Sequence, residues 1–319
     1  MLNRRILRIK AFKAIYAYAE NPSMSLKDVE AQLEISCQST RTLYLFMLSV
    51  VKPLVEEARG RIEAAKSKFN PTEEEKNPNM KFVNNSIYRI LTQDPDFTKI
   101  ISKSKLSWDQ FDVFLRKLYD SIRSKEYFAE YMASPESSLQ QDAELFVKIF
   151  EEEFMDSADL DGILEDMSLY WIDDLGYALT YCCRTMEDLA AGRAWSLPPL
   201  YQSEMAPKAG QESDKAFVSG VVRTAYVNFE KFSQYIAEAV PKWDGERLVT
   251  IDKVLVLCGL AEAKCFSEIP VKVTINEYVD ISKFYSTPKS RSFVNGLLDT
   301  IIKKKIEEGE IVKTGKGLV

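Results

Sequence analysis

The sequence contains no histidine. Without histidine, the chain cannot build a Ser–His or Cys–His nucleophilic site, a zinc site with histidine ligands, or the commonest general base of enzymes. A catalytic site would instead need a pair of carboxylates in a cleft, an arrangement that a sequence alone does not reveal. The absence of histidine therefore favours a non-catalytic protein.

Glycine is also scarce, and none of the 12 glycines belongs to a nucleotide-binding motif. The segment from Gly309 to Lys316 superficially resembles a phosphate-binding loop. However, five residues separate its glycines where the motif has four, and Gly317 stands where a serine or threonine is required. A dinucleotide-binding fingerprint and a Cys-x-x-Cys pair are absent as well. We therefore expect no cofactor, no bound metal and no enzymatic activity.

The chain has few cysteines and no long apolar run. Its five cysteines are odd in number and lie in apolar sequence surroundings, which favours reduced, buried thiols over a disulfide framework. No apolar run approaches the roughly 20 residues that span a bilayer. Met1 leads directly into an amphipathic segment without the apolar core of a signal peptide. These features predict a cytoplasmic protein that makes no membrane contact.

Helical patterning, in contrast, extends along most of the sequence and predicts an all-α fold. In the first two thirds of the chain we expect helices over residues 25–35, 39–69, 82–91, 96–102, 107–132, 141–154 and 160–187. Residues 70–79 are rich in proline and asparagine and predict a loop, and residues 196–213 predict a linker. The apolar residues of the expected 107–132 helix should belong to a core: Trp108, Phe111, Phe114, Leu115, Leu118 and Tyr119.

Acidic residues are concentrated between Asp142 and Gly176, where the single base is Lys148. This segment lacks the ligand order and the glycine of an EF-hand, so a solvated acidic face is favoured over a metal site. The net charge of −6 argues against a protein coated in nucleic acid, although an average can hide a polarised surface.

The most informative stretch extends from Ile269 to Asp299. Pro270 suits the first turn of one helix, and Thr287 with Pro288 suits the start of a second. One apolar face of that second helix is formed by Val294, Leu297, Leu298 and Ile301.

Phe293 falls at the edge of this apolar face, beside Gly296 and Lys289. An aromatic ring next to a glycine and a cation could stack on an unpaired base. Alternatively, Phe293 could complete the core while Gly296 permits close helix packing. The spacing of the residues leaves both interpretations open.

Residues 3–20 form a second informative stretch, with five cations and one anion. Arg4, Arg5 and Arg8 fall within about a third of the circumference of a helix. A helix that presents arginines beside tyrosines is suited to the phosphates and bases of RNA. A merely solvated basic face is the alternative.

These two stretches together resemble the NusB family of transcription antitermination factors. The matching residues are Lys272-Val273-Thr274-Ile275-Asn276-Glu277, Val279, Lys283 and Phe293-Val294-Asn295-Gly296-Leu297-Leu298-Asp299. The resemblance also extends over residues 215–263 and 3–20. It implies a NusB-like helical bundle of two packed subdomains.

Relatives lack most of residues 25–213, so the resemblance also implies a large helical insertion. We expect a first, arginine-rich helix at 1–24, an inserted helical region at 25–195, a linker at 196–213, and a NusB-like C-terminal domain at 214–319. Relatives usually carry a glycine and an acidic pair before the final helix, where this chain has Ser286, Pro288 and Lys289. Lys289 in place of an acid should strengthen the attraction to phosphate.

The family function implied by the resemblance is transcription antitermination. The protein would bind single-stranded boxA-type RNA together with NusE, a small-subunit ribosomal protein, in the transcription elongation complex, and so promote transcription of ribosomal RNA. Its RNA-binding residues would be Arg4, Arg5, Arg8, Lys13 and Tyr16 in the first helix and Lys289, Ser290, Arg291 and Phe293 before and in the last long helix.

Asp252 occupies the position of a family acid that lies on the surface meeting NusE, although favourable placement at a helix N-terminus would also explain it. The alternative function is a non-catalytic protein-interaction scaffold that keeps the NusB fold without binding RNA. The acidic net charge and the insertion favour that alternative.

Overall fold

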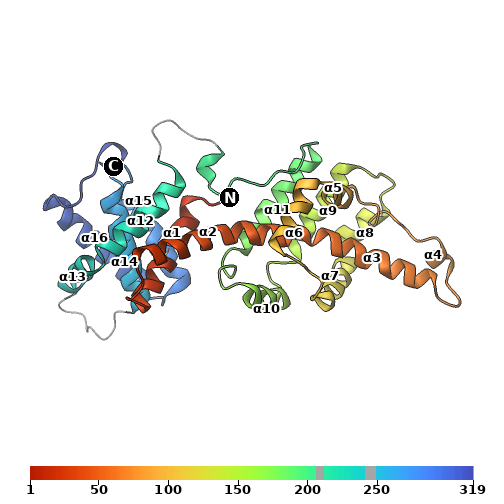
Figure 1. The fold of residues 1–319 in the computed structure, drawn as a ribbon, viewed down its shortest axis with the longest axis horizontal. Coiled ribbons are helices and arrows are strands. Elements are labelled where there is room, and N and C mark those ends of the chain that lie inside the picture. Colours follow the sequence, from red (N-terminus) through yellow and green to blue (C-terminus); the bar gives the residue numbers. More distant parts are fainter. Residues whose placement is uncertain (206–211, 241–248, 319) are drawn as a thin grey trace. The chain divides into compact units, whose positions relative to one another are not determined.

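The structure is a computed structural model that describes residues 1–205, 212–240 and 249–318. Its regular secondary structure is helical, which confirms the all-α prediction (Figure 1). An isolated β-bridge joins Leu2 to Tyr201. Among the described residues, no helix is long and apolar enough to cross a membrane.

The chain folds as two compact units. The first unit comprises residues 38–198 together with Met1, and the second comprises residues 2–37 and 199–319. Helix α2 (Leu26–Ser49) contributes to both units, because the division falls between Cys37 and Gln38. The limits of 25 and 195 for an insertion remain a prediction.

Besides the second half of α2, the described residues of the first unit contain nine complete helices: α3 (Val51–Lys66), α4 (Glu73–Lys76), α5 (Ser86–Gln93), α6 (Pro95–Ser104), α7 (Asp112–Ser124), α8 (Glu126–Ala133), α9 (Leu139–Glu152), α10 (Ala158–Met167) and α11 (Leu175–Ala190). The predicted core residues around Trp108 are buried, except Phe111, which is half-buried. The indole ring of Trp108 stacks on Phe46 with 4.1 Å between ring centroids, and its Nε1 donates to the Phe46 carbonyl at 3.0 Å.

Two predicted helix boundaries near the start of this unit were wrong. No gap separates residues 35 and 39, because α2 continues through them without a proline or glycine. The expected helix 39–69 is instead interrupted at Val50. Pro53 explains the interruption, since proline has no N–H for the Ser49 carbonyl and its ring clashes with that carbonyl.

Three further segments differ from the prediction. The expected helix 107–132 begins only at Asp112 and divides at Lys125, whose ψ of 145° is extended. The expected helix 160–187 divides into α10 and α11. The expected loop 70–79 contains the single turn α4, which forms because Thr72 and Glu75 make a reciprocal capping box.

The acidic segment 142–176 is mostly a solvated face, but two of its acids lie inside the first unit. Asp142 accepts hydrogen bonds from the Tyr131 hydroxyl and the Ser86 amide, each at 2.6 Å. Asp174 accepts a hydrogen bond from Thr40. In the parts of the chain that the structure describes, no group of three or more acidic or cysteine side chains is arranged to hold a metal ion.

The five cysteines all lie in described residues, and none forms a disulfide. Cys37, Cys182 and Cys258 are buried, as expected. The prediction of buried thiols was wrong for Cys265, which is exposed because it ends α14 where the chain leaves the core.

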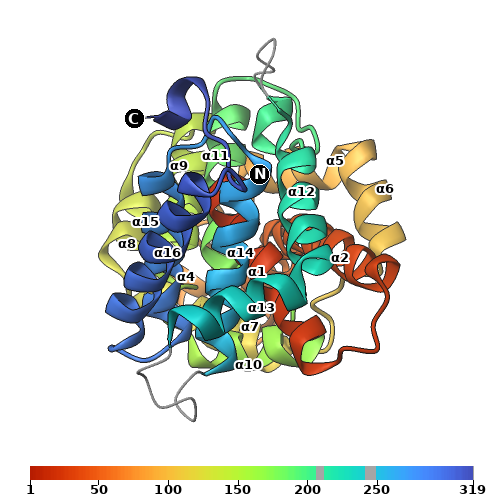
Figure 2. The same cartoon turned by 90° about the vertical axis from the view of Figure 1, so that its left-hand side faces the viewer.

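The second unit is built around α14 (Thr250–Cys265). This helix packs against α1 (Arg4–Glu20), α12 (Asp214–Val227), α13 (Phe229–Ala239), α15 (Val271–Tyr285) and α16 (Ser290–Glu307). Figure 2 shows α14 enclosed by these helices. A Cβ atom on Gly259 would lie 2.6 Å from Leu298 Cδ2 of α16, so a larger residue at this position would force the Leu298 side chain to move.

The segment 196–213 is partly packed, although residues 206–211 of this expected linker lie outside the described residues. Leu200 and Tyr201 are buried. The Leu2 amide donates to the Leu200 carbonyl at 2.7 Å, and the Gln202 amide donates to the Leu2 carbonyl at 2.9 Å. These bonds fix the start of α1 within the second unit.

Candidate nucleic-acid interface

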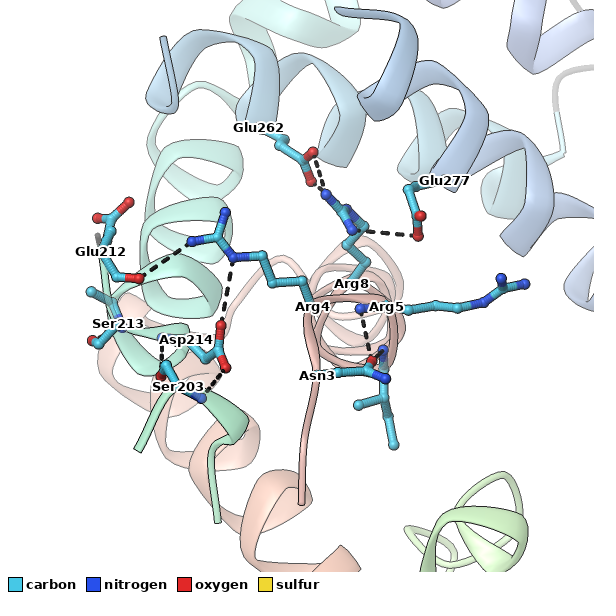
Figure 3. Close-up of polar contacts among 12 residues, drawn as sticks. Asn3, Arg4, Arg5, Arg8, Ser203, Glu212, Ser213, Asp214, Glu262 and Glu277 are labelled. Carbon is cyan, nitrogen blue, oxygen red and sulfur yellow. Dashed lines mark hydrogen bonds and ion pairs between the residues drawn. The ribbon is translucent and has the colours of Figure 1, made fainter. Parts of the chain in front are cut away.

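The three arginines of α1 point in different directions (Figure 3). Arg4 and Arg5 extend to opposite sides of the helix, and Arg8 points toward Glu262 and Glu277. Arg4 is half-buried, with its Nε 3.5 Å from Asp214 Oδ1 and its Nη2 donating to the Glu212 carbonyl at 3.3 Å. Arg5 is exposed. The predicted group of three arginines therefore does not form one basic strip.

Arg8 belongs to the core, where 4% of its surface is exposed. Its Nε and Nη2 donate to the two carboxylate oxygens of Glu262 at 2.7 and 2.9 Å, and its Nη1 lies 3.3 Å from Glu277 Oε2. Burial alone would lower the pKa of Arg8, but the hydrogen bond and charge of Glu262 outweigh burial and raise the pKa above its ordinary value. We therefore assign Arg8 to the core and remove it from the RNA contacts.

The sequence did contain a signal for this buried pair. Glu262 lies in α14 among residues that are otherwise apolar, from Val254 to Ala263. A carboxylate buried in such a helix requires a cation or several hydrogen-bond donors. Thr274 supplies a second donor to Glu262, at 2.9 Å. Arg8 thus links α1 to α14 and α15 through charge.

Asp252 holds the connection between α15 and α16 in place. Its Oδ1 accepts a hydrogen bond from the Ser286 hydroxyl at 2.6 Å, and its Oδ2 accepts one from the Ser290 hydroxyl at 2.7 Å. Both Asp252 and Ser290 are buried. Neither side chain is accessible to a ligand. We therefore assign structural roles to Ser290, which was predicted to bind RNA, and to Asp252, which was predicted to bind NusE.

Replacing Asp252 by alanine is expected to destabilise the second unit by about 1–3 kcal/mol, because two serine hydroxyls lose their acceptor. Urea unfolding followed by circular dichroism measures this loss. Asp299→Ala is a matched control, since Asp299 is half-buried in α16 and pairs with Lys303 in the same helix. An equal, small effect of both substitutions would contradict the role of Asp252.

The connection between α15 and α16 lies against α1. The Tyr285 ring at the end of α15 is 5.4 Å from the Phe12 ring, and Lys13 Nζ lies 5.6 Å from the Tyr285 ring centroid. Tyr16 is half-buried next to Phe12, with 6.1 Å between their ring centroids. Two sequence stretches from opposite ends of the chain thus meet at one place.

Asp280 of α15 pairs with Lys283 in the same helix and is also affected by the charges of cations in α1 and α16. The hydrogen bond from Lys283, followed by the charges of Lys283, Arg5 and Arg291, lowers the pKa of Asp280 against a smaller opposing effect of burial. Arg5 and Arg291 therefore act on the same carboxylate.

The start of α16 supplies the remaining predicted residues. Lys289 and Arg291 are exposed, and Phe293 is half-buried. The apolar face predicted for this helix is confirmed, because Val294, Leu297, Leu298 and Ile301 are buried. A shallow pocket between α15 and α16 is lined by Asn276, Val279, Pro288, Arg291, Ser292 and Asn295. We define the basic corner as Arg5, Lys13, Lys289 and Arg291 with the aromatic residues Tyr16 and Phe293.

The acidic charge of the chain belongs to the first unit. Residues 38–198 carry 28 acids and 19 bases, whereas the rest of the chain carries 20 acids and 23 bases. The basic corner lies in the unit with the net positive charge. The overall negative charge therefore does not argue against RNA binding by the second unit.

The second unit is thus an all-α bundle with basic and aromatic residues gathered at one corner. Comparison with known sequences identifies its family. The sequence model of the NusB family matches residues 190–303. The chain is 34% identical over 120 residues to transcription antitermination protein NusB of Salinibacter ruber, which covers 38% of this chain and 75% of that protein. The chain belongs to the NusB family.

Two further relatives carry the same name. The chain is 36% identical over 105 residues to the protein of Chloroherpeton thalassium, covering 33% of this chain and 50% of that protein. It is 38% identical over 97 residues to the protein of Thermodesulfovibrio yellowstonii, covering 30% of this chain and 64% of that protein. The chain thus spans less than two thirds of these two relatives. No solved structure matches the chain.

Proposed function

We propose that this protein is a non-catalytic transcription antitermination factor that binds single-stranded RNA at the basic corner. The observation that supports the proposal most strongly is the contact between the end of α15 and α1, where the Tyr285 ring lies 5.4 Å from the Phe12 ring and 5.6 Å from Lys13 Nζ. Membership of the NusB family and the names of its relatives, which are transcription antitermination proteins, support the same function.

In this proposal, the cations and the aromatic rings have different tasks. Arg5, Lys13, Lys289 and Arg291 contact phosphates, which provides affinity without sequence preference. Tyr16 and Phe293 stack on bases, each contributing about 1–3 kcal/mol. Arg8 and Asp252 touch no RNA and instead position α1 and the start of α16. The ligand is a boxA-type RNA of ribosomal leaders, bound jointly with NusE.

Fluorescence anisotropy with a labelled boxA RNA tests this function directly. We expect binding that weakens with salt, that exceeds binding to a scrambled RNA of equal length, and that strengthens when NusE is added. Counterion release from the phosphates is the reason for the salt dependence. Equal affinity for both RNAs, with no response to NusE, would contradict the antitermination proposal.

A second candidate function is that of a protein-interaction scaffold, and we assign it to the first unit alone. The excess of acids in residues 38–198 disfavours a polyanion there and favours a protein partner. Leu169, Tyr170 and Ile172 are exposed in the connection between α10 and α11, next to Asp173. Substitutions in this connection should leave RNA affinity unchanged if the two functions are separate.

A further inference from the structure

Helix α15 ends with a phenylalanine that is not part of the core. Phe284 is 77% exposed, whereas Ile281 and Ser282 of the same turn are buried. Burying a phenylalanine side chain is worth about 1.5–3 kcal/mol, so this ring gains free energy from any ligand that covers it. Single exposed apolar residues are common, and the surroundings of Phe284 decide what it can do.

Phe284 lies on the same face of α15 as two acidic residues, and the partners of these acids show what surrounds this face. Asp280 and Glu277 precede it by four and seven residues, so the three side chains lie along one face of α15. Glu277 lies against Arg8 of α1, and the charges of Arg5 and Arg291 act on Asp280. This face of α15 therefore contacts α1 through Glu277.

The residues next to Phe284 in sequence connect it to the basic corner. Tyr285 touches Phe12 and Lys13 of α1. Lys283 is exposed and pairs with Asp280. A phosphate near Lys283 and a base on the Phe284 ring would thus belong to one nucleotide that continues a strand bound at the basic corner.

We propose that Phe284 is an additional nucleobase-stacking site, which extends the RNA-binding surface from the basic corner along the exposed face of α15. This inference rests on the proposed RNA-binding function. Because every base presents a π-face, the site accepts any unpaired base and contributes affinity without reading sequence. The NusB motif in this segment includes Lys283 but not Phe284, which is why the sequence did not indicate the site.

Phe284→Ala tests the inference in anisotropy titrations of the full chain with boxA RNA. Loss of one stacking contact should weaken binding about 5- to 150-fold. The slope of log affinity against log salt should stay unchanged, because no charge is removed. Phe284→Trp should retain affinity, and Phe284→Leu should lose it although leucine is also apolar. Phe69→Ala removes a ring that is 98% exposed in the first unit and should change nothing.

A second readout is the fluorescence of the Phe284→Trp variant. A base stacked on the new indole should quench emission on RNA binding beyond the change seen with the unsubstituted protein. Wild-type affinity in both Phe284→Ala and Phe284→Leu would overturn the stacking site while leaving RNA binding intact. Wild-type affinity in Phe284→Leu alone would show a non-stacking apolar contact and would also overturn it. If the unsubstituted protein binds no RNA, the proposed function fails and the inference fails with it.

Discussion

Replacing Arg8 by alanine is expected to destabilise the second unit by about 3–5 kcal/mol, because it leaves the buried carboxylate of Glu262 without its cation. Such a loss is a large part of the stability of a typical domain. Urea unfolding monitored by circular dichroism measures it. The Arg8→Ala chain should unfold at clearly lower urea than the unsubstituted chain.

Arg5→Ala is the matched control, since it removes the same charge from an exposed position of the same helix. Its effect on stability should stay within about 0.5 kcal/mol. A double substitution, Arg8→Met with Glu262→Leu, should recover much of the stability because it removes both charges together. If Arg8→Ala leaves stability intact and instead lowers the salt dependence of RNA binding, Arg8 contacts phosphate and its assignment to the core is incorrect.

The triple substitution of Arg5, Lys289 and Arg291 by alanine is expected to weaken RNA binding about ten- to a hundredfold at low salt. The slope of log affinity against log salt should fall by about 0.7 for each cation that contacts a phosphate, which is about 2 in total. Lys289→Asp should weaken binding more than Lys289→Ala, because the new carboxylate repels phosphate. Anisotropy titrations at four or more salt concentrations give both quantities.

Removing the same number of cations from the first unit provides the control for net charge. Lys66, Lys99 and Lys103 are exposed there, and their triple alanine variant should bind RNA with an unchanged slope. A similar slope change in both triple variants would mean that binding follows overall charge. The basic corner would then have no special role in the interaction.

The residues of α15 and α16 show how much of the site the sequence predicts. Their fixed identities indicated the NusB family, and the spacing of Val294, Leu297, Leu298 and Ile301 correctly gave the buried face of α16. Pro53 could likewise have given the break between α2 and α3 from its missing N–H. Features that depend on neighbouring residues in the sequence, such as these, can be predicted from the sequence alone.

Burial of polar side chains was not predicted, because it depends on contacts between distant segments. Helical spacing placed Arg4, Arg5 and Arg8 on one arc, yet Asp214 and Glu262 come from other helices and occupy two of the three. Asp252 similarly finds its partners Ser286 and Ser290 only after α14, α15 and α16 have packed. A list of basic or acidic residues therefore overestimates a binding surface.

The unequal distribution of acids and bases between the two units changes how this protein should behave on charged supports. Electrostatic attraction is screened beyond about 8 Å at physiological ionic strength. A nucleotide strand at the basic corner consequently responds mainly to the charges that lie within about this distance of it. The isoelectric point of about 5.2 predicts that an anion exchanger retains the protein. Because of its basic corner, the same protein should also be retained by a polyphosphate or heparin matrix.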